Sequence, residues 1–386
     1  MTFSDDSRWQ SFRQAMPVTQ KWAYFDHAAV APLPETTAQA IKNWCDQAAH
    51  EGDVVWLDWE RAVENTRESG AQLIGAKKEE IALVSNTTHG INLVAEGLAW
   101  KPGDNLVVLG NEFPSNLYPW LHQQTKGVEV RVIPVDGVQP DLNRIAEACD
   151  ENTRLLSISW VSYKTGWRIN PKEVAKIAHD AGALFFLDAI QGMGVFPLDV
   201  RDADIDFLSA DGHKWMLGPE GAGLFYVKQE LLSELHPIGI GWNSVAGRKN
   251  FDNIDLTFRD SAARYEGGSQ NMPGLIGLGA SLDLLLEYGA GPQTSAIGER
   301  VLQVTDYACQ RLESVGAKIL ASRQGDERSG IVSFQIPGKL PQALRAAGQK
   351  MGVNFSVRGD FARISPHAYN NQADIERLLE TLAAVD

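Results

Sequence analysis

The chain has 386 residues, a formal net charge of -14 and a hydrophobic content of 44%. This length leaves room for two or three domains, and the acidic balance argues against a surface that binds nucleic-acid phosphates. No stretch approaches the roughly 18 apolar residues of a membrane span, and the first twenty residues lack the apolar core of a signal peptide. We therefore expect a cytoplasmic globular protein without a membrane or nucleic-acid partner.

The N-terminal part contains a loop that offers a first candidate residue. Residues 22–34 read as a short strand followed by a small-residue loop that two prolines close, and His27 is its most notable side chain. The loop is either an ordinary turn or the wall of a site. Amphipathic helices are expected at 35–49 and 60–74.

A hydroxyl-rich turn follows next. An apolar strand at 81–84 runs into a turn that contains Thr87 and Thr88, and a helix is expected at 91–98. Such a turn is either a helix cap or an anion cradle, because helix N-termini attract phosphate.

From residue 105 onward, apolar strands alternate with helices. This alternation is typical of a mostly parallel sheet that is covered on both faces, in which ligands bind at the carboxyl ends of the strands. We expect strands at 105–109, 128–135, 154–160 and 183–187 and helices at 142–149 and 172–181. Polar and aromatic candidates follow these strands: Glu112, Phe113, Ser115, Ser162, Tyr163, Asp188 and Gln191.

Lys214 is the most informative residue of the chain. It lies in a glycine-rich loop between strand signals at 205–208 and 223–227, where an ordinary solvated charge is out of place. Upstream, the apolar run at 183–187 predicts a buried strand, and the carboxylate of Asp188 follows it directly. A lysine that forms a Schiff base and an aspartate that keeps a pyridine nitrogen protonated are the two groups that a pyridoxal phosphate enzyme most needs. The sequence therefore predicts pyridoxal 5'-phosphate as cofactor.

The C-terminal third changes character. Residues 237–259 form a loose segment with Trp242, which we interpret as a mobile or interface loop, and Ser269 precedes a helix at 275–288. A small α+β domain is expected beyond residue 289. Its predicted elements are helices at 298–315 and 372–384 and strands at 331–336 and 361–364. The expected division is a large domain at 20–288 and a small one at 1–19 and 289–386.

With Asp188, Gln191, His213 and Lys214 in place, the chain resembles the fold-type I pyridoxal phosphate enzymes, specifically the class V aminotransferase and cysteine desulfurase superfamily. The resemblance covers nearly the whole chain. It implies an α/β fold with a large domain, built on a mostly parallel seven-stranded sheet flanked by helices, and a small α+β C-terminal domain. It also implies a homodimer with shared active sites that acts on an amino acid.

The resemblance implies a role for each matching residue. Lys214 would form the Schiff base, Asp188 would pair with the pyridinium nitrogen, and Gln191 would reach the phenolic oxygen of the cofactor. Thr87, Thr88 and His213 would bind its phosphate, and Ser269 would serve the site of the partner subunit. Arg363 would clamp the substrate carboxylate. Arg358 and His27 are further substrate-binding candidates, and no metal is expected.

The chain departs from the cysteine desulfurases at three places. Phe113 replaces a histidine that stacks on the cofactor ring, as in the isopenicillin N epimerase-like branch, and Tyr163 replaces an asparagine. No cysteine lies between Arg358 and Arg363, where desulfurases carry their nucleophile. The three cysteines, Cys45, Cys149 and Cys309, are far apart, so we interpret them as reduced and structural.

These observations favour an enzyme that acts at Cα of an amino acid, with Lys214 as the base. The first hypothesis is an aminotransferase or epimerase-like reaction, in which His27 or Tyr163 would supply the second acid of an epimerase. The alternative is a carbon-sulfur lyase that works by β-elimination. A persulfide-forming cysteine desulfurase and a non-catalytic binding protein with this fold rank behind both.

Overall fold

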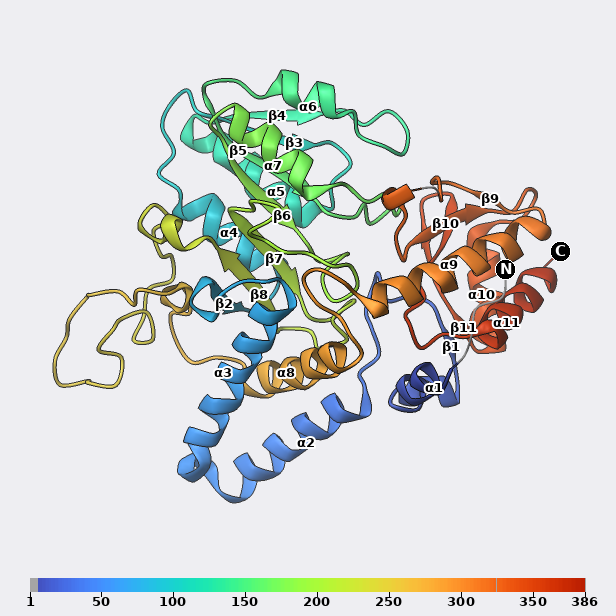
Figure 1. Ribbon diagram of the computed structural model, residues 1–386, viewed down its shortest axis with the longest axis horizontal. Coiled ribbons are helices and arrows are strands. Elements are labelled where there is room, and N and C mark those ends of the chain that lie inside the picture. Colours follow the sequence, from blue (N-terminus) through green and yellow to red (C-terminus); the bar gives the residue numbers. More distant parts are fainter. Residues whose placement is uncertain (1–5, 324, 386) are drawn as a thin grey trace.

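A seven-stranded sheet forms the centre of the larger part of the molecule (Figure 1). The computed structural model describes residues 6–323 and 325–385. The strands are β2 Ile81–Val84, β3 Asn105–Leu109, β4 Glu129–Ile133, β5 Thr153–Ser159, β6 Leu184–Asp188, β7 Phe207–Asp211 and β8 Gly223–Val227. Their order across the sheet is β2-β8-β7-β6-β5-β3-β4. Among the described residues, β8 is the one strand whose direction is opposite to that of the other strands of this sheet, since it pairs antiparallel with both β7 and β2.

Helices cover both faces of this sheet. Alternating side chains give each strand apolar residues for two cores; in β2, Ile81 and Leu83 join one core, whereas Ala82 and Val84 join the other. Helices α3, α7 and α8 contribute to the first core and α4 and α5 to the second, and α2 packs on α8 (Figure 1). The helices are α2 Glu35–His50, α3 Trp56–Leu73, α4 Thr87–Gly97, α5 Tyr118–His122, α6 Leu142–Ala148, α7 Pro171–Asp180 and α8 Met272–Glu287.

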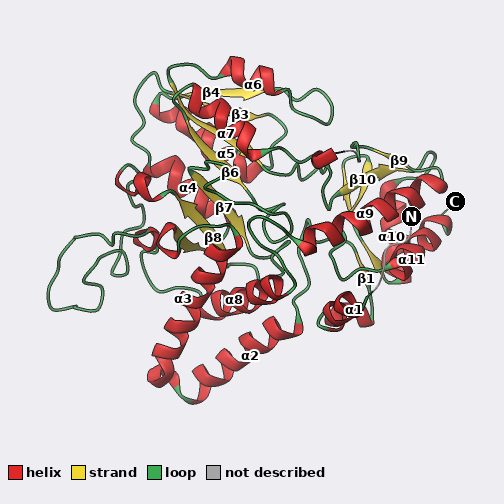
Figure 2. Cartoon of the chain, in the orientation of Figure 1, coloured by secondary structure: helices red, strands yellow, loops and turns green. Residues whose placement is uncertain are grey.

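A smaller four-stranded antiparallel sheet lies beside the large one, at the right of Figure 2. Its strands are β9 Lys318–Ile319, β10 Val332–Gln335, β12 Ser356–Arg358 and β13 Phe361–Ile364, in the order β12-β13-β10-β9. A separate parallel pair joins β1 Ala23–Tyr24 to β11 Val353–Asn354. The helices of this part are α1 Ser7–Gln14, α9 Ala296–Ser314, α10 Pro341–Met351 and α11 Gln372–Ala383.

The predicted fold class is confirmed, because the chain combines a mostly parallel seven-stranded sheet with a small antiparallel one. The division into domains at residues 20 and 289 stays a prediction. Within the described ranges, every helix is too short or too polar to cross a bilayer.

Several elements begin at other residues than predicted, and two of these differences bear on the site. The strand expected at 205–208 runs over Phe207–Asp211, and its polar end was not recognised as strand. Ser209 and Asp211 are nevertheless buried there. The hydroxyl of Ser209 donates to the backbone oxygen of Thr87 in the neighbouring helix, and the backbone N–H of Asp211 donates to Thr87 Oγ1. Helix α4 begins at Thr87 instead of residue 91, since the side chain of Asn86 caps the helix by accepting from the backbone N–H of His89 at 2.8 Å.

Candidate active site

A cavity of about 300 Å³ opens at the edge of the large sheet where its parallel strands end. This is the position expected for a ligand site on such a sheet, and the volume suits a small-molecule cofactor. The structure brings most of the predicted residues together in its wall. These are Thr87, Thr88, Phe113, Tyr163, Asp188, Gln191, His213, Lys214, Arg358 and Arg363.

Lys214 lies in the loop between β7 and β8 and lines the cavity, where its amine has no hydrogen-bond partner among the described residues. Glycines let this loop pack tightly on α8, since a Cβ on Gly212 or Gly218 would lie 2.7 Å from Leu278. Burial lowers the pKa of Lys214 to about 8, although the charge of Asp188 opposes the shift. The amine is therefore closer to its neutral, nucleophilic form than that of an exposed lysine.

Asp188 is the last residue of β6 and reaches the cavity from the floor of the sheet. Burial raises the pKa of Asp188 to about 6, whereas the backbone N–H of Ile190, 3.1 Å from Oδ1, and the charge of Lys214 lower it. A cation in the cavity would therefore stabilise the ionised carboxylate. A protonated pyridine nitrogen is such a cation.

The N-terminus of α4 forms a polar end of the cavity. Its dipole and free backbone N–H groups attract anions. Thr88 Oγ1 donates to Ser115 Oγ at 2.9 Å, and Thr87 Oγ1 accepts from the backbone N–H of Asp211 at 2.9 Å. Nδ1 of His213 lies 3.0 Å from Oδ2 of Asp211 in the same region. Hydroxyls, an imidazole and a helix terminus thus surround a place that suits a phosphate group.

Arg363 is fully buried and held by three neighbours. Its terminal nitrogens donate to the backbone oxygen of Tyr163 at 2.6 Å, to Ser356 Oγ at 3.1 Å and to Asp26 Oδ1 at 3.4 Å. Burial lowers the pKa of Arg363 to about 10, and the charge of Arg358 adds to this effect. The guanidinium is thus fixed in place, and its Nε has no hydrogen-bond partner among the described residues, so it keeps a donor for a substrate carboxylate.

The other cavity residues were partly predicted. The rings of Phe113 and Tyr163 meet edge to face with centroids 5.2 Å apart, and the Phe113 ring lies 5.6 Å from the Lys214 amine. Sequence reasoning missed Asp26 and Ser159. The only signal for Ser159 was its place at the end of β5, whereas Asp26 precedes the small-residue loop without any local mark of its pairing with β12 and β13.

The structure places His27 outside the wall of the Lys214 cavity, where a substrate contact was predicted. His27 is fully buried, and among the described residues it does not line the cavity. Its Nδ1 lies 2.7 Å from the backbone oxygen of Ser365, and its Nε2 lies 2.7 Å from the hydroxyl of Tyr369. Burial and the neighbouring His367 hold the pKa of His27 well below its ordinary value. Since both ring nitrogens have buried partners, His27 is unsuited to proton transfer with a substrate.

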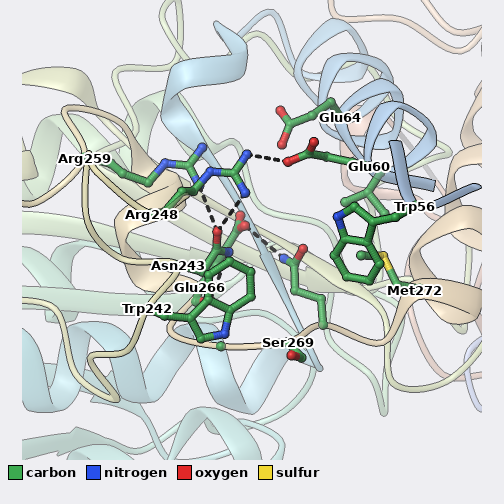
Figure 3. A pocket seen from close by; sticks show the side chains of 13 residues that line it. Trp56, Glu60, Glu64, Trp242, Asn243, Arg248, Arg259, Glu266, Ser269 and Met272 are labelled. Atoms are coloured by element: carbon green, nitrogen blue, oxygen red, sulfur yellow. Dashed lines mark hydrogen bonds and ion pairs between the residues drawn. The ribbon is translucent and has the colours of Figure 1, made fainter. Parts of the chain in front are cut away.

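Ser269 lies in a different pocket of the same chain, beside Trp242 and Trp56 (Figure 3). Glu266 faces this pocket too and binds the buried Arg67, so it anchors the segment before α8. Among the described residues of one chain, Ser269 does not join the wall of the Lys214 cavity. A contact with the cofactor would have to occur across subunits, which stays a prediction.

The cavity fits pyridoxal phosphate in size and in the chemistry of its donors. A lysine amine opens into it without a partner, a buried carboxylate faces the same space, and a hydroxyl-rich helix terminus closes one end. Lys214 would hold the aldehyde carbon, Asp188 the ring nitrogen, and Thr87, Thr88 and His213 the phosphate.

Known proteins are similar to this chain in sequence and in fold. The family model for class-V aminotransferases matches residues 23–378. A probable cysteine desulfurase of Methanothermobacter thermautotrophicus is 32% identical over 98% of this chain and 98% of that protein. The apo structure of a cysteine desulfurase from Thermococcus onnurineus NA1 has a TM-score of 0.86 at 26% identity and covers 99% of this chain and 98% of its own.

A third protein is similar in fold. The complex between a cystine C–S lyase and its reaction product, cysteine persulfide, superposes with a TM-score of 0.88 at 22% identity, over 96% of this chain and 99% of the other. None of these three proteins is an isopenicillin N epimerase, so the narrower resemblance drawn from Phe113 stays a prediction.

Proposed function

The chain belongs to the class-V aminotransferase family and is a pyridoxal phosphate enzyme, and we propose that it is a carbon-sulfur lyase that eliminates sulfur from Cβ of cysteine or cystine. This ranks the lyase reaction above the aminotransferase or epimerase-like reaction predicted from the sequence alone. The observation that carries the proposal is a complete Cα-activating site, with Lys214 and Asp188 in one cavity, next to a hairpin that has no cysteine.

The hairpin between β12 and β13 has no cysteine at the position where cysteine desulfurases carry the thiol that becomes a persulfide. Strands β12 and β13 pair as far as Arg358 and Phe361, so Gly359 and Asp360 alone connect them. Gly359 adopts φ +57°, which suits such a tight turn. This two-residue turn contains no cysteine and is too short to carry one into the cavity. Sulfur that leaves the substrate therefore leaves as a free product.

The cysteines elsewhere are poorly suited to replace that nucleophile. Cys45, Cys149 and Cys309 do not line the cavity among the described residues. Burial raises the pKa of Cys149 to about 11 and that of Cys309 to about 12, which keeps both as thiols. Cys45 is exposed on α2, away from the cavity wall.

Arg363 and Lys214 have different roles in the proposed reaction. Arg363 binds the substrate carboxylate, and Lys214 in its neutral form takes the proton from Cα. The cofactor, when bound by Lys214 and Asp188, would supply an electron sink for the pair that this proton leaves behind. The Cβ–S bond then breaks, and sulfur departs with the electron pair. Cysteine plus water yields pyruvate, ammonia and hydrogen sulfide, and cystine plus water yields pyruvate, ammonia and cysteine persulfide.

Epimerisation would need a second acid in the cavity. His27 lies outside the cavity wall, so Tyr163 is the remaining candidate for this acid, and its ring lies against Phe113. A β-elimination needs no such group, which is a further reason to prefer the lyase.

Incubation of the cofactor-loaded enzyme with L-cysteine, L-cystine and L-alanine tests the proposal. We expect pyruvate and ammonia in equal amounts from the two sulfur substrates without any added keto acid, and none from alanine. Treatment with iodoacetamide should leave the activity intact, because no enzyme thiol takes part. Pyruvate that forms from alanine only when a second keto acid is supplied as amino acceptor would identify an aminotransferase, and exchange of the alanine Cα hydrogen in D₂O with inversion would identify an epimerase.

We also propose a homodimer in which Ser269 contributes to the site of the partner subunit. A long loop before α8 extends away from the body of the molecule (Figure 1) and carries the exposed apolar residues Phe251, Ile254 and Leu256. Ile254 is 92% exposed, which is unfavourable unless another surface covers it.

We expect Ile254→Asp to weaken dimerisation by at least about tenfold, because association would bury a charge. Light scattering after gel filtration measures the mass. Leu340→Asp is a matched control, since Leu340 is a large exposed apolar residue before α10, outside this loop. A monomeric wild-type protein, or equal effects of the two substitutions, would contradict the dimer.

A further inference from the structure

The side chain of Gln191 is held by two buried neighbours. Its Oε1 accepts a hydrogen bond from the indole N–H of Trp215 at 2.8 Å, and its Nε2 donates to the backbone oxygen of Ala28 at 3.1 Å. Gln191 is 3% exposed and lines the cavity of Lys214. Its amide therefore has one N–H without a partner among the described residues.

These two bonds allow only one orientation of the amide. A half-turn would set the NH₂ group of Gln191 against the indole N–H, which can only donate, and its oxygen against the Ala28 carbonyl, which can only accept. Both bonds would be lost inside the protein, where unpaired polar groups are costly. Trp215 and Ala28 thus decide which atom of Gln191 occupies which position.

The orientation gives the cavity a donor. Ala28 is part of the cavity wall, whereas Trp215 is 1% exposed and belongs to the large core. The nitrogen of the Gln191 amide therefore lies on the side of the cavity and the oxygen on the side of the core. With the amide reversed, the cavity would receive an acceptor instead.

Trp215 itself is tightly fixed. Its ring packs against those of His27 and His367, with centroids 6.1 and 6.0 Å away. A Cβ on Gly330 would lie 2.4 Å from the indole, so the packing leaves the ring no room to shift. His367 also lies 3.3 Å from the backbone oxygen of Trp215 through its Nε2.

We propose that Trp215 is a positioning residue that holds Gln191 as a hydrogen-bond donor toward the phenolic oxygen of the cofactor. This inference rests on the cofactor of the proposed function and is independent of which reaction follows. A donor stabilises the ionised oxygen and thereby lowers the affinity of the bound chromophore for a proton. The residue thus acts on the spectrum and proton affinity of the resting enzyme through Gln191.

Absorbance titration of the holoenzyme without substrate tests this role. We expect Trp215→Phe to retain the cofactor but to raise the pKa of its chromophore by roughly 0.5 to 1 unit, which is a three- to tenfold increase in proton affinity. Gln191→Ala should raise it similarly. The double variant should show no further increase, because residues that act through one contact are not additive.

Trp160→Phe is the matched control. Trp160 is also 1% exposed, and its indole nitrogen has no partner among the described residues. It should leave the chromophore pKa unchanged while losing a similar volume from the core.

The outcomes distinguish a failure of the positioning role from a failure of the proposed function. A titration of Trp215→Phe equal to that of the wild type, or additive effects in the double variant, would overturn the positioning role while the proposed function stands. A wild-type protein that binds no pyridoxal phosphate would overturn both. If Trp215→Phe does not fold, Trp215→benzothienylalanine still decides: it keeps the shape of the indole, lacks its N–H and must raise the chromophore pKa.

Discussion

Lys214→Ala is expected to lower kcat by about 10³- to 10⁴-fold, because it removes both the base at Cα and the amine that holds the cofactor. The cofactor should still bind through the phosphate end of the cavity, but borohydride should no longer attach it to the protein. Steady-state assays of pyruvate formation and mass spectrometry of the reduced protein measure the two effects. Activity within tenfold of the wild type would rule out Lys214 as the base.

Lys228→Ala is the matched control for this experiment. Lys228 follows β8 and pairs with Asp204 at 2.9 Å, away from the cavity wall. Its removal should leave activity and cofactor attachment unchanged. The pH dependence gives a second test. Because the pKa of Lys214 is lowered to about 8, the rate of cofactor attachment to the apoenzyme should rise as pH increases through that value.

The sequence predicted the site at Lys214 because its signals are local. An apolar run that ends in Asp188 and a glycine-rich loop around Lys214 are visible within a few residues, and parallel strands bring such ends to one edge of a sheet. The structure places Asp188 and Lys214 in the wall of one cavity, with Thr87 and Thr88 at the same edge.

What could not be predicted depends on partners far away in the chain. His27 is withdrawn from the cavity by Ser365 and Tyr369, which follow it by more than 300 residues. His367 is buried beside His27, and burial lowers its pKa to about 4. Asp26 likewise meets Arg363 only because β1 and the segment after it lie against the C-terminal strands. Hydrophobic patterns carry no information on such pairings.

Glu266→Ala is expected to lower the free energy of unfolding by about 3–5 kcal/mol, because it leaves a buried arginine without its fully buried carboxylate partner. Both terminal nitrogens of Arg67 donate to the Glu266 carboxylate, and the two side chains are 4% and 1% exposed. Burial alone would lower the pKa of Arg67, but the charge of Glu266 raises it above its ordinary value, so Arg67 stays charged. The urea midpoint at fixed protein concentration measures the loss.

Glu64→Ala separates the fully buried pair from a pair in which one partner, Glu64, is partly exposed. Glu64 Oε2 lies 3.1 Å from Nε of Arg67, but its side chain is 43% exposed. Such pairs contribute about 0–1 kcal/mol, so this variant should unfold close to the wild type. Equal losses for Glu64→Ala and Glu266→Ala would contradict the prediction.

The double substitution Arg67→Met with Glu266→Leu tests the cause of the loss. No charge then remains buried, so most of the stability lost in Glu266→Ala should return. The recovery should be incomplete, because Glu266 also accepts from the backbone N–H of Leu83 at 2.8 Å and from Gln270 at 2.9 Å. These bonds tie β2 to the segment that carries Ser269. If that segment serves the partner subunit, the double variant should regain its fold but keep a weakened hold on the cofactor.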